Sequence, residues 1–304
     1  MKPRTASATA LRASLMRALH ARTDPHPVLD DPWGDRLVPA EARAALYEAV
    51  RSQVPGLPEH PGESTMRSVL DVALRSVAAY ANVVLRSRHA EEALERALAR
   101  GVRQYVLVGA GFDSYALRRP PSAAGLRVVE VDHPDTQALK RACIAKSGVA
   151  LPDTVDFVAA DLAQETLAAA LRRSALRLSE PAFFSWLGVT MYLSREANLA
   201  TLRDIAATAA PGSELVFSYL DAAVLRLPEA DQPEPFRALR ERVAASGEPF
   251  LSGFDPATLA RDLAPLGLAV VEDLSDDELA RRYDPEGRNG FVTSAHSRIA
   301  HART

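Results

Sequence analysis

The hydrophobic positions of this chain follow two different patterns, which change near residue 100. Before that point, apolar residues recur at the three- and four-residue spacing of helices over 8–22, 41–53 and 64–100. Gly101 follows the last of these patterns, as a helix C-cap often does. Proline-rich stretches separate the patterns and are predicted as loops. The sequence thus predicts an N-terminal helical cap, or lid region, over residues 1–100.

From residue 103 onward, short apolar runs alternate with helical patterns. The runs lack polar alternation, which is typical of parallel strands that are covered on both faces. The predicted strands are 104–109, 127–131, 155–159, 182–187, 214–220 and 268–272, with a possible seventh at 291–299. Helices are predicted at 134–147, 162–178 and 195–210, and another is predicted to begin with Asp255 as N-cap and Pro256 as its first residue. This alternation predicts a doubly wound α/β sheet, which binds ligands beyond the carboxyl ends of its strands.

Composition and charge narrow the function classes. The 304 residues are 47% hydrophobic and 25% charged, as in ordinary soluble domains, and the net charge of -3 gives no basic excess for nucleic acid or an anionic membrane. No signal-type segment or apolar run of about 18 residues appears, so a cytoplasmic location is expected. Cys143 is the only cysteine, and the histidines lack metal-ligand spacing, so no metal is predicted. The α/β domain is expected to span 101–304, with an insertion at 222–254.

A candidate ligand site follows the first two predicted strands. Gly109, Ala110 and Gly111 come directly after the first strand, where glycine lets the backbone turn tightly and approach a ligand. Asp132 ends the second strand, and its carboxylate could accept hydrogen bonds from both hydroxyls of a ribose. Glu130 lies two residues earlier on the same side of the strand and competes for that role. Together these residues predict a nucleoside-type cofactor.

The loop favours one cofactor over another. A dinucleotide requires a third glycine or alanine for close helix packing, and Ser114 occupies that position. Asp113 would also place a negative charge beside a pyrophosphate. S-adenosylmethionine has no phosphate, so an acidic loop is compatible with it. The residues therefore favour the methyl donor, and an NAD-dependent oxidoreductase is the alternative.

The sequences GVRQYVLVGAGFDSYALR (101–118) and VVEVDHPDTQALK (128–140) resemble the leucine carboxyl methyltransferase superfamily. Within it they resemble the bacterial branch of tetracenomycin-type polyketide O-methyltransferases. The resemblance continues at Asp161-Leu162, at GVTMYLS (188–194) and over 247–268. It implies a class I methyltransferase fold that binds S-adenosylmethionine. It also implies methyl transfer to a hydroxyl or carboxylate of a small molecule or peptide, in bacterial secondary metabolism.

The resemblance also assigns roles to individual residues. Arg86 falls on the arginine that holds the methionine carboxylate, and Arg88 is the neighbouring alternative. Asp132 would bind the ribose, Asp161 the adenine amino group and Leu162 the adenine ring, although Asp161 could instead cap the next helix. The complete set of expected cofactor-binding residues is Arg86, Gly109, Ala110, Gly111, Asp113, Glu130, Asp132, Asp161 and Leu162.

The sequence gives fewer indications of the residues that contact the methyl acceptor. Tyr192 lies beyond the fourth strand and is either a substrate contact or a core aromatic residue. Leu187 stands where many members of the family carry a glutamate, so a carboxylate that could orient the substrate is missing. A catalytically inactive, cofactor-binding homologue is therefore a further alternative. The N-terminal helices and the 222–254 insertion are expected to cover the active site and set its specificity.

Overall fold

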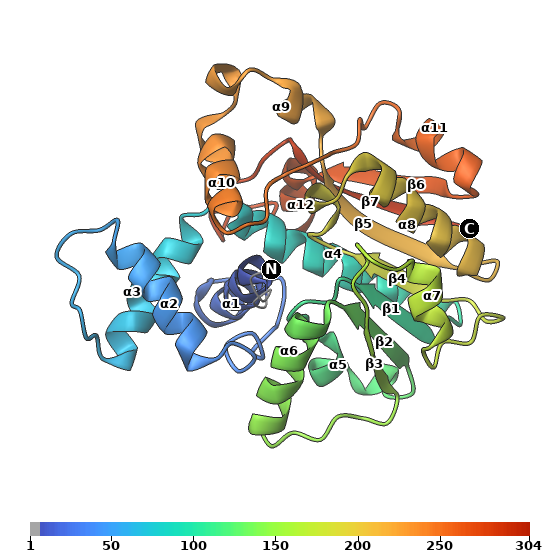
Figure 1. Ribbon diagram of the computed structural model, residues 1–304, viewed down its shortest axis with the longest axis horizontal. Coiled ribbons are helices and arrows are strands. Elements are labelled where there is room, and N and C mark those ends of the chain that lie inside the picture. The colour runs from blue at the N-terminus through green and yellow to red at the C-terminus, as the bar shows by residue number, and fades with distance from the viewer. Residues whose placement is uncertain (1–6) are drawn as a thin grey trace.

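The computed structural model describes residues 7–304 and contains one seven-stranded sheet (Figure 1). The strand order is β3-β2-β1-β4-β5-β7-β6. All neighbouring pairs are parallel except those of β7, which runs antiparallel to both β5 and β6. The strands are β1 (Gln104–Val108), β2 (Arg127–Asp132), β3 (Val155–Ala159), β4 (Phe183–Trp186), β5 (Glu214–Leu220), β6 (Ala269–Ser275) and β7 (Ser297–Arg303). The predicted doubly wound sheet is confirmed, and its order reverses beside β1, where a ligand site is expected.

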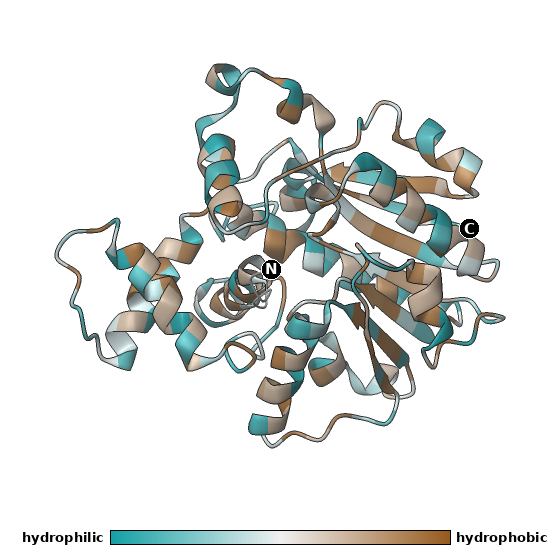
Figure 2. Ribbon diagram, in the orientation of Figure 1, coloured by the Kyte–Doolittle hydropathy of each residue, from teal (hydrophilic) through white to brown (hydrophobic). Residues whose placement is uncertain are grey.

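Helices cover both faces of the sheet, and the apolar strands lie between them (Figure 2). One buried cluster joins the sheet to α7, α8 and α11, and the other joins it to α4, α5 and α12. The α-helices are α1 (Ala8–Thr23), α2 (Ala40–Arg51), α3 (Glu63–Arg75), α4 (Ala79–Ala99), α5 (Tyr115–Arg118), α6 (Pro134–Lys146), α7 (Leu167–Arg172), α8 (Arg195–Thr208), α9 (Ala222–Arg226), α10 (Glu234–Ala245), α11 (Leu259–Leu263) and α12 (Asp276–Tyr283). Short 3-10 turns occupy Pro121–Ala123, Thr190–Tyr192, Glu229–Asp231 and Ala264–Leu266.

The single long helix predicted over 64–100 is wrong. The structure has two helices, α3 and α4, which meet at a bend of 82°. The Ser76 hydroxyl donates to the Ala73 carbonyl at 2.8 Å, which offers the backbone an alternative to continuing the helix. Within residues 7–304 no single helix is long and apolar enough to span a membrane, and only this bent pair passes the same test by length and composition.

Three further expectations need correction. The last strand is Ser297–Arg303 rather than 291–299, because β7 is buried between β5 and β6 and its alanines carry little strand signal in the sequence. Asp255 accepts from the Ala257 amide and closes only a turn, so α11 begins at Leu259 instead. The helix predicted over 162–178 shortens to α7, whose first turn is capped by Thr166.

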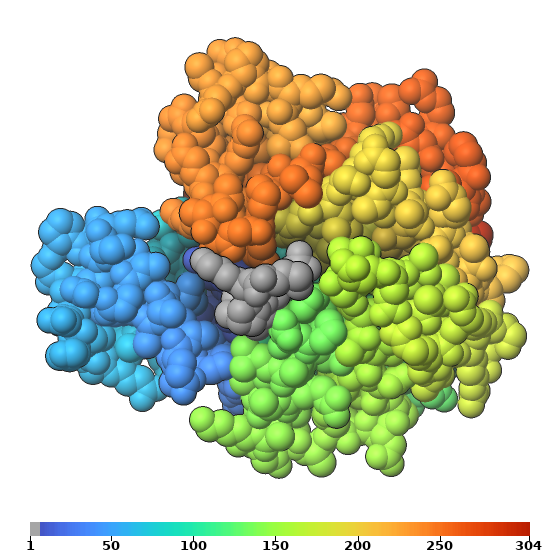
Figure 3. Space-filling view, viewed as in Figure 1, coloured from blue at the N-terminus to red at the C-terminus, as the bar shows by residue number. Residues whose placement is uncertain are grey.

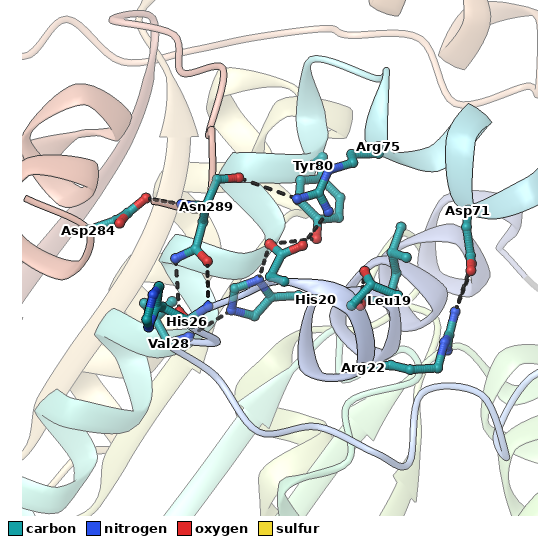
Figure 4. A network of polar contacts seen from close by, with 12 residues as sticks. Leu19, His20, Arg22, His26, Val28, Asp71, Arg75, Tyr80, Asp284 and Asn289 are labelled. Carbon is teal, nitrogen blue, oxygen red and sulfur yellow. Dashed lines mark hydrogen bonds and ion pairs between the residues drawn. The ribbon is translucent and has the colours of Figure 1, made fainter. Parts of the chain in front are cut away.

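A buried polar network fastens α1 to α4 and to the loop before β7 (Figure 4). Asp24 accepts from His20 Nδ1 at 2.6 Å, from the Tyr80 hydroxyl at 3.1 Å and from Arg75. Nε2 of His20 accepts from the Val28 amide at 2.8 Å, so the proton of the neutral ring lies on Nδ1. The Asn289 carbonyl accepts from Arg75 at 3.4 Å, which ties the network to the loop. The position of α1 is thus fixed by contacts distant in sequence.

This network predicts a measurable loss of stability in Tyr80→Phe. The substitution removes one buried hydrogen bond to the Asp24 carboxylate but keeps the ring. We expect a decrease of about 1 to 2 kcal/mol in the free energy of unfolding, measured by urea denaturation. Tyr47→Phe is the matched control, because the Tyr47 hydroxyl donates to the Pro58 carbonyl outside the network. A smaller loss in Tyr80→Phe than in the control would contradict the role given to Asp24.

Candidate functional site

Two cavities meet beyond the carboxyl ends of the central strands. The first, of about 530 Å³, is lined by the glycine loop after β1, the end of β2, the segment after β4 and the start of α1. The second, of about 880 Å³, lies among α1, α2, α3, α4 and α10 and is mostly apolar. Arg86, Gly188 and Tyr192 line both cavities and mark their junction. Thr9 and Ala13 of α1 also line both.

The glycine loop forms the floor of the first cavity. The amides of Gly109 and Ala110 donate to the Val131 carbonyl at 2.9 and 3.1 Å, which holds the loop against the end of β2. Gly109 has a φ of 65°, and a Cβ there would lie 2.6 Å from Cγ2 of Val189. Glycine is therefore required for this turn. Asp113 lines the same cavity and accepts from the Tyr115 amide at 2.8 Å.

The two carboxylates of β2 have different surroundings. Asp132 lines the first cavity and accepts from the amides of Gly111 and His133, while its burial raises its pKa. Glu130 does not line that cavity and forms an ion pair with Lys140, in which both side chains are only 2% exposed. Burial raises the pKa of Glu130 to about 7, and Lys140 opposes this shift. The structure therefore brings Asp132, but not Glu130, to the cavity.

Arg86 lies on α4 and points into the junction. Its Nη1 donates to Oδ1 of Asn82 at 2.7 Å, and Nδ2 of Asn82 donates to Asp276 at 2.8 Å. A Cβ on Gly188 would lie 2.4 Å from Nη2 of Arg86, so glycine leaves the room that the guanidinium fills. Within residues 7–304, no carboxylate lies within 4.0 Å of this guanidinium, and burial lowers its pKa to about 10. It is a desolvated cation without an ion-pair partner in the part of the chain that the structure describes.

Arg88 has a different environment. It pairs with Glu95 at 3.6 Å and lies over the Tyr283 ring, and it lines neither cavity. Of the two arginines that the sequence left open, only Arg86 reaches the site.

Tyr192 lies at the junction and packs its ring 5.7 Å from that of Phe250. Burial and the nearby Glu248 carboxylate raise the pKa of Tyr192 to about 12. The phenol is therefore protonated at neutral pH, which suits a hydrogen-bond donor rather than a base. Leu187 also lines the first cavity, so an apolar side chain, and not a carboxylate, faces the site at this position.

Asp161 and Leu162 follow β3 and do not line either cavity. Asp161 accepts from the Ala163 amide at 3.0 Å and lies 3.9 Å from Nε2 of His133, which does line the first cavity. Leu162 packs against the sheet core. Their contact with adenine stays a prediction.

The first cavity also contains residues of α1 and of the 222–254 insertion that the sequence did not predict. Thr9, Ala13 and Arg17 face it at four-residue spacing along α1, which is the one local signal that could have marked them. Arg17 is held by Asp31 at 2.7 Å and by the Phe112 carbonyl at 2.6 Å. Glu248 accepts from Ser7 at 2.7 Å and from Thr9, which closes the insertion onto α1. Within residues 7–304 no group of three or more metal-ligating side chains was found.

Comparison with known proteins identifies the family. The sequence profile of the "Leucine carboxyl methyltransferase" family matches residues 10–206. The chain belongs to the leucine carboxyl methyltransferase family. It is 27% identical over 286 residues to a Bacillus subtilis protein named "Putative S-adenosyl-L-methionine-dependent methyltransferase YktD", covering 92% of this chain and 91% of that one. A Mycolicibacterium vanbaalenii protein of the same description is 30% identical over 246 residues, covering 79% and 74%.

The fold agrees with this assignment. The crystal structure of a DUF574 family protein from Streptomyces avermitilis superposes with a TM-score of 0.56 at 18% identity, covering 96% of each chain. The predicted class I methyltransferase fold is confirmed, and the cofactor of the family is S-adenosylmethionine. The closer resemblance to the tetracenomycin-type branch stays a prediction.

The residues of this methyltransferase fit that cofactor. The cofactor carries a carboxylate, and the site offers the Arg86 guanidinium without an anionic partner among the described residues. Its ribose has two hydroxyl donors, and Asp132 presents a carboxylate at the end of β2. Gly109 and Gly111, both with positive φ, let the backbone after β1 turn along the floor of the same cavity.

Proposed function

We propose that this methyltransferase transfers a methyl group to an oxygen, either a hydroxyl or a carboxylate, of a small molecule or peptide. The observation that carries the proposal is the position of Arg86 at the junction of two cavities. One cavity has the loop and carboxylate of a nucleoside site, and the other is a larger apolar chamber. A role in bacterial secondary metabolism rests on the resemblance alone.

In this proposal, the first cavity holds the cofactor. Arg86 would bind the methionine carboxylate, and the backbone of Gly109 to Gly111 would hold the methionine portion. Asp132 would accept from the ribose hydroxyls, and the adenine would extend out of the cavity past His133 to reach Asp161 and Leu162. When bound, the cofactor supplies a methyl group that is already activated by the positive charge on sulfur.

The second cavity holds the acceptor, with its reacting oxygen at the junction. Apolar walls exclude water and restrict the acceptor to a few orientations. Tyr192, protonated at neutral pH, donates a hydrogen bond that positions the acceptor oxygen. None of the described residues lining the second cavity is a carboxylate that could serve as a general base. The imidazole among these described residues is that of His296, and an acceptor oxygen that is already ionised needs no general base.

The proposal is tested by incubating the purified protein with S-adenosylmethionine and a panel of aromatic acids, phenols, peptides and amines. We expect S-adenosylhomocysteine to form together with an O-methylated product, both detected by mass spectrometry. Methylation of only nitrogen or carbon would contradict the proposal. Binding of NAD without S-adenosylmethionine would favour the oxidoreductase. Cofactor binding without transfer to any acceptor would favour an inactive homologue, consistent with Leu187.

The site also predicts a pH dependence of cofactor binding. Burial raises the pKa of Asp276 to about 7, while Asn82, Ser297 and Arg86 lower it and Asp277 raises it. A bound carboxylate beside Arg86 would raise that pKa further, so the complex takes up a proton that the free protein has released. Binding of S-adenosylhomocysteine should therefore weaken roughly three- to tenfold between pH 6 and pH 8.

Titration calorimetry at pH 6, 7 and 8 measures this dependence. Asp276→Asn is the matched control, because an amide oxygen can still accept from Asn82 but cannot ionise. Its affinity should change little over the same range. An equally steep pH dependence in Asp276→Asn would assign the effect to another group.

A further inference from the structure

The second cavity is unusual in its combination of apolar walls and charge. Helices α2 and α3 form one wall of this cavity and α10 forms another, and in Figure 3 these two parts protrude from the surface next to each other. Val72 and Val292 line the cavity although each is 72% exposed, so apolar surface continues to its opening. An acceptor that fills about 880 Å³ of this space must itself be largely apolar.

The charged side chains that the described residues bring to this cavity carry only one sign. Among the described residues that line it there is no aspartate or glutamate, whereas three arginines do line it, Arg12, Arg86 and Arg242. The whole chain has slightly more acidic than basic residues, 39 against 36, so composition alone does not produce this bias. Arg86 is assigned to the cofactor carboxylate, which leaves Arg12 and Arg242 without a role in the proposed reaction.

Arg12 and Arg242 lie close enough to repel each other. Burial and the charge of Arg242 both lower the pKa of Arg12, which is half-buried on α1, and the more weakly acting Glu248 and Tyr192 only partly oppose this shift. Nη1 of Arg12 donates to the Ser246 hydroxyl at 3.3 Å, and in residues 7–304 neither arginine has a carboxylate oxygen within 4.0 Å. The neighbouring Glu248 instead accepts from Ser7 and Thr9 and lines the cofactor cavity. An anion between the two guanidinium groups would relieve this repulsion.

We propose that the acceptor is a largely apolar molecule with an anionic group, such as a carboxylate, which Arg12 and Arg242 bind away from the reacting oxygen. Both arginines line only the acceptor cavity, whereas the residues at the junction line both cavities. The anionic group is therefore an anchor that orients the acceptor, and a second oxygen of the same molecule receives the methyl group. This inference rests on the proposed function, because it takes the second cavity as the acceptor site.

Two fluorescent probes of matched shape test the anchor: 1-pyrenebutyrate, an anion, and 1-pyrenebutanol, which is neutral. In the presence of saturating S-adenosylhomocysteine, the protein should bind the acid roughly tenfold or more tightly than the alcohol. The double variant Arg12→Gln/Arg242→Gln should lose this preference while retaining its affinity for the alcohol. Arg237→Gln is the control, because it removes the same charge from α10 but does not line the cavity.

The outcomes separate the two proposals. Equal binding of the probes, binding of neither probe, or an acid preference that survives in the double variant would overturn the anchor. An equal loss in Arg237→Gln would also overturn it, since long-range charge would then explain the preference. Binding of S-adenosylhomocysteine is measured by calorimetry for every variant. If the double variant does not bind S-adenosylhomocysteine, the single variant Arg242→Gln, at an exposed residue, takes its place. Failure of the unsubstituted protein to bind S-adenosylhomocysteine would instead refute the proposed function.

Discussion

Replacing Arg86 with glutamine is expected to weaken binding of S-adenosylhomocysteine by about 2 to 3 kcal/mol, roughly 30- to 140-fold. The guanidinium is the one cation that lines both cavities without a carboxylate partner among the described residues. The fold has already removed the Arg86 guanidinium from water, so ligand binding costs little further desolvation of this group. Most of the attraction between the guanidinium and the ligand carboxylate therefore contributes to affinity. Arg86→Lys keeps the charge but loses the planar fork, and it should retain only part of the affinity.

Thermal unfolding distinguishes a role of Arg86 in cofactor binding from a role in stabilising the fold. Because burial disfavours the charged form of Arg86, the ligand-free Arg86→Gln protein should unfold at the same temperature or a higher one. Ligand at 100 times its dissociation constant should stabilise the unsubstituted protein by about 2.7 kcal/mol, and most of this shift should vanish in the variant. Arg88→Gln is the control, because Arg88 pairs only loosely with Glu95 on another face of α4. A similar loss of affinity in Arg88→Gln would contradict the assignment.

The cofactor side of the site could be predicted because it is local in sequence. The turn at Gly109 and the carboxylate of Asp132 each follow directly from a strand end, and parallel strands bring their carboxyl ends to one edge. Strand alternation could not choose between Glu130 and Asp132, since both lie on the same side of β2. Lys140, one helix away, makes the choice by pairing with Glu130.

The parts that the sequence did not reveal depend on contacts between distant segments. The Ser7 contact with Glu248 spans 241 residues, and no local pattern marks either residue as part of a cavity. The bend between α3 and α4 has the same origin, since both halves have helical patterns and Arg75 and Tyr80 on either side of it converge on Asp24. The anionic-anchor arginines also come from two such segments, α1 and α10.

The largest expected effect on stability comes from Lys140→Met, which should lower the free energy of unfolding by about 3 to 5 kcal/mol at pH 8. The substitution leaves the Glu130 carboxylate buried without its cation. Because the folded-state pKa of Glu130, about 7, exceeds the ordinary value, its contribution to stability is greatest at low pH and declines as the pH rises toward 7. Loss of Lys140 raises that pKa further, so the destabilisation should be smaller at pH 6 than at pH 8.

The double variant Glu130→Gln/Lys140→Met tests the cause, because it removes both charges. It should recover most of the stability at pH 8 and lose the pH dependence, as measured by urea denaturation. A single variant that is destabilised by less than about 1 kcal/mol, or equally at both pH values, would contradict the buried ion pair.

The same double variant also tests whether Glu130, in place of Asp132, binds the ribose of the cofactor. If Asp132 alone binds the ribose, the folded double variant should bind S-adenosylhomocysteine as tightly as the unsubstituted protein, whereas a weaker affinity would return Glu130 to the cofactor site.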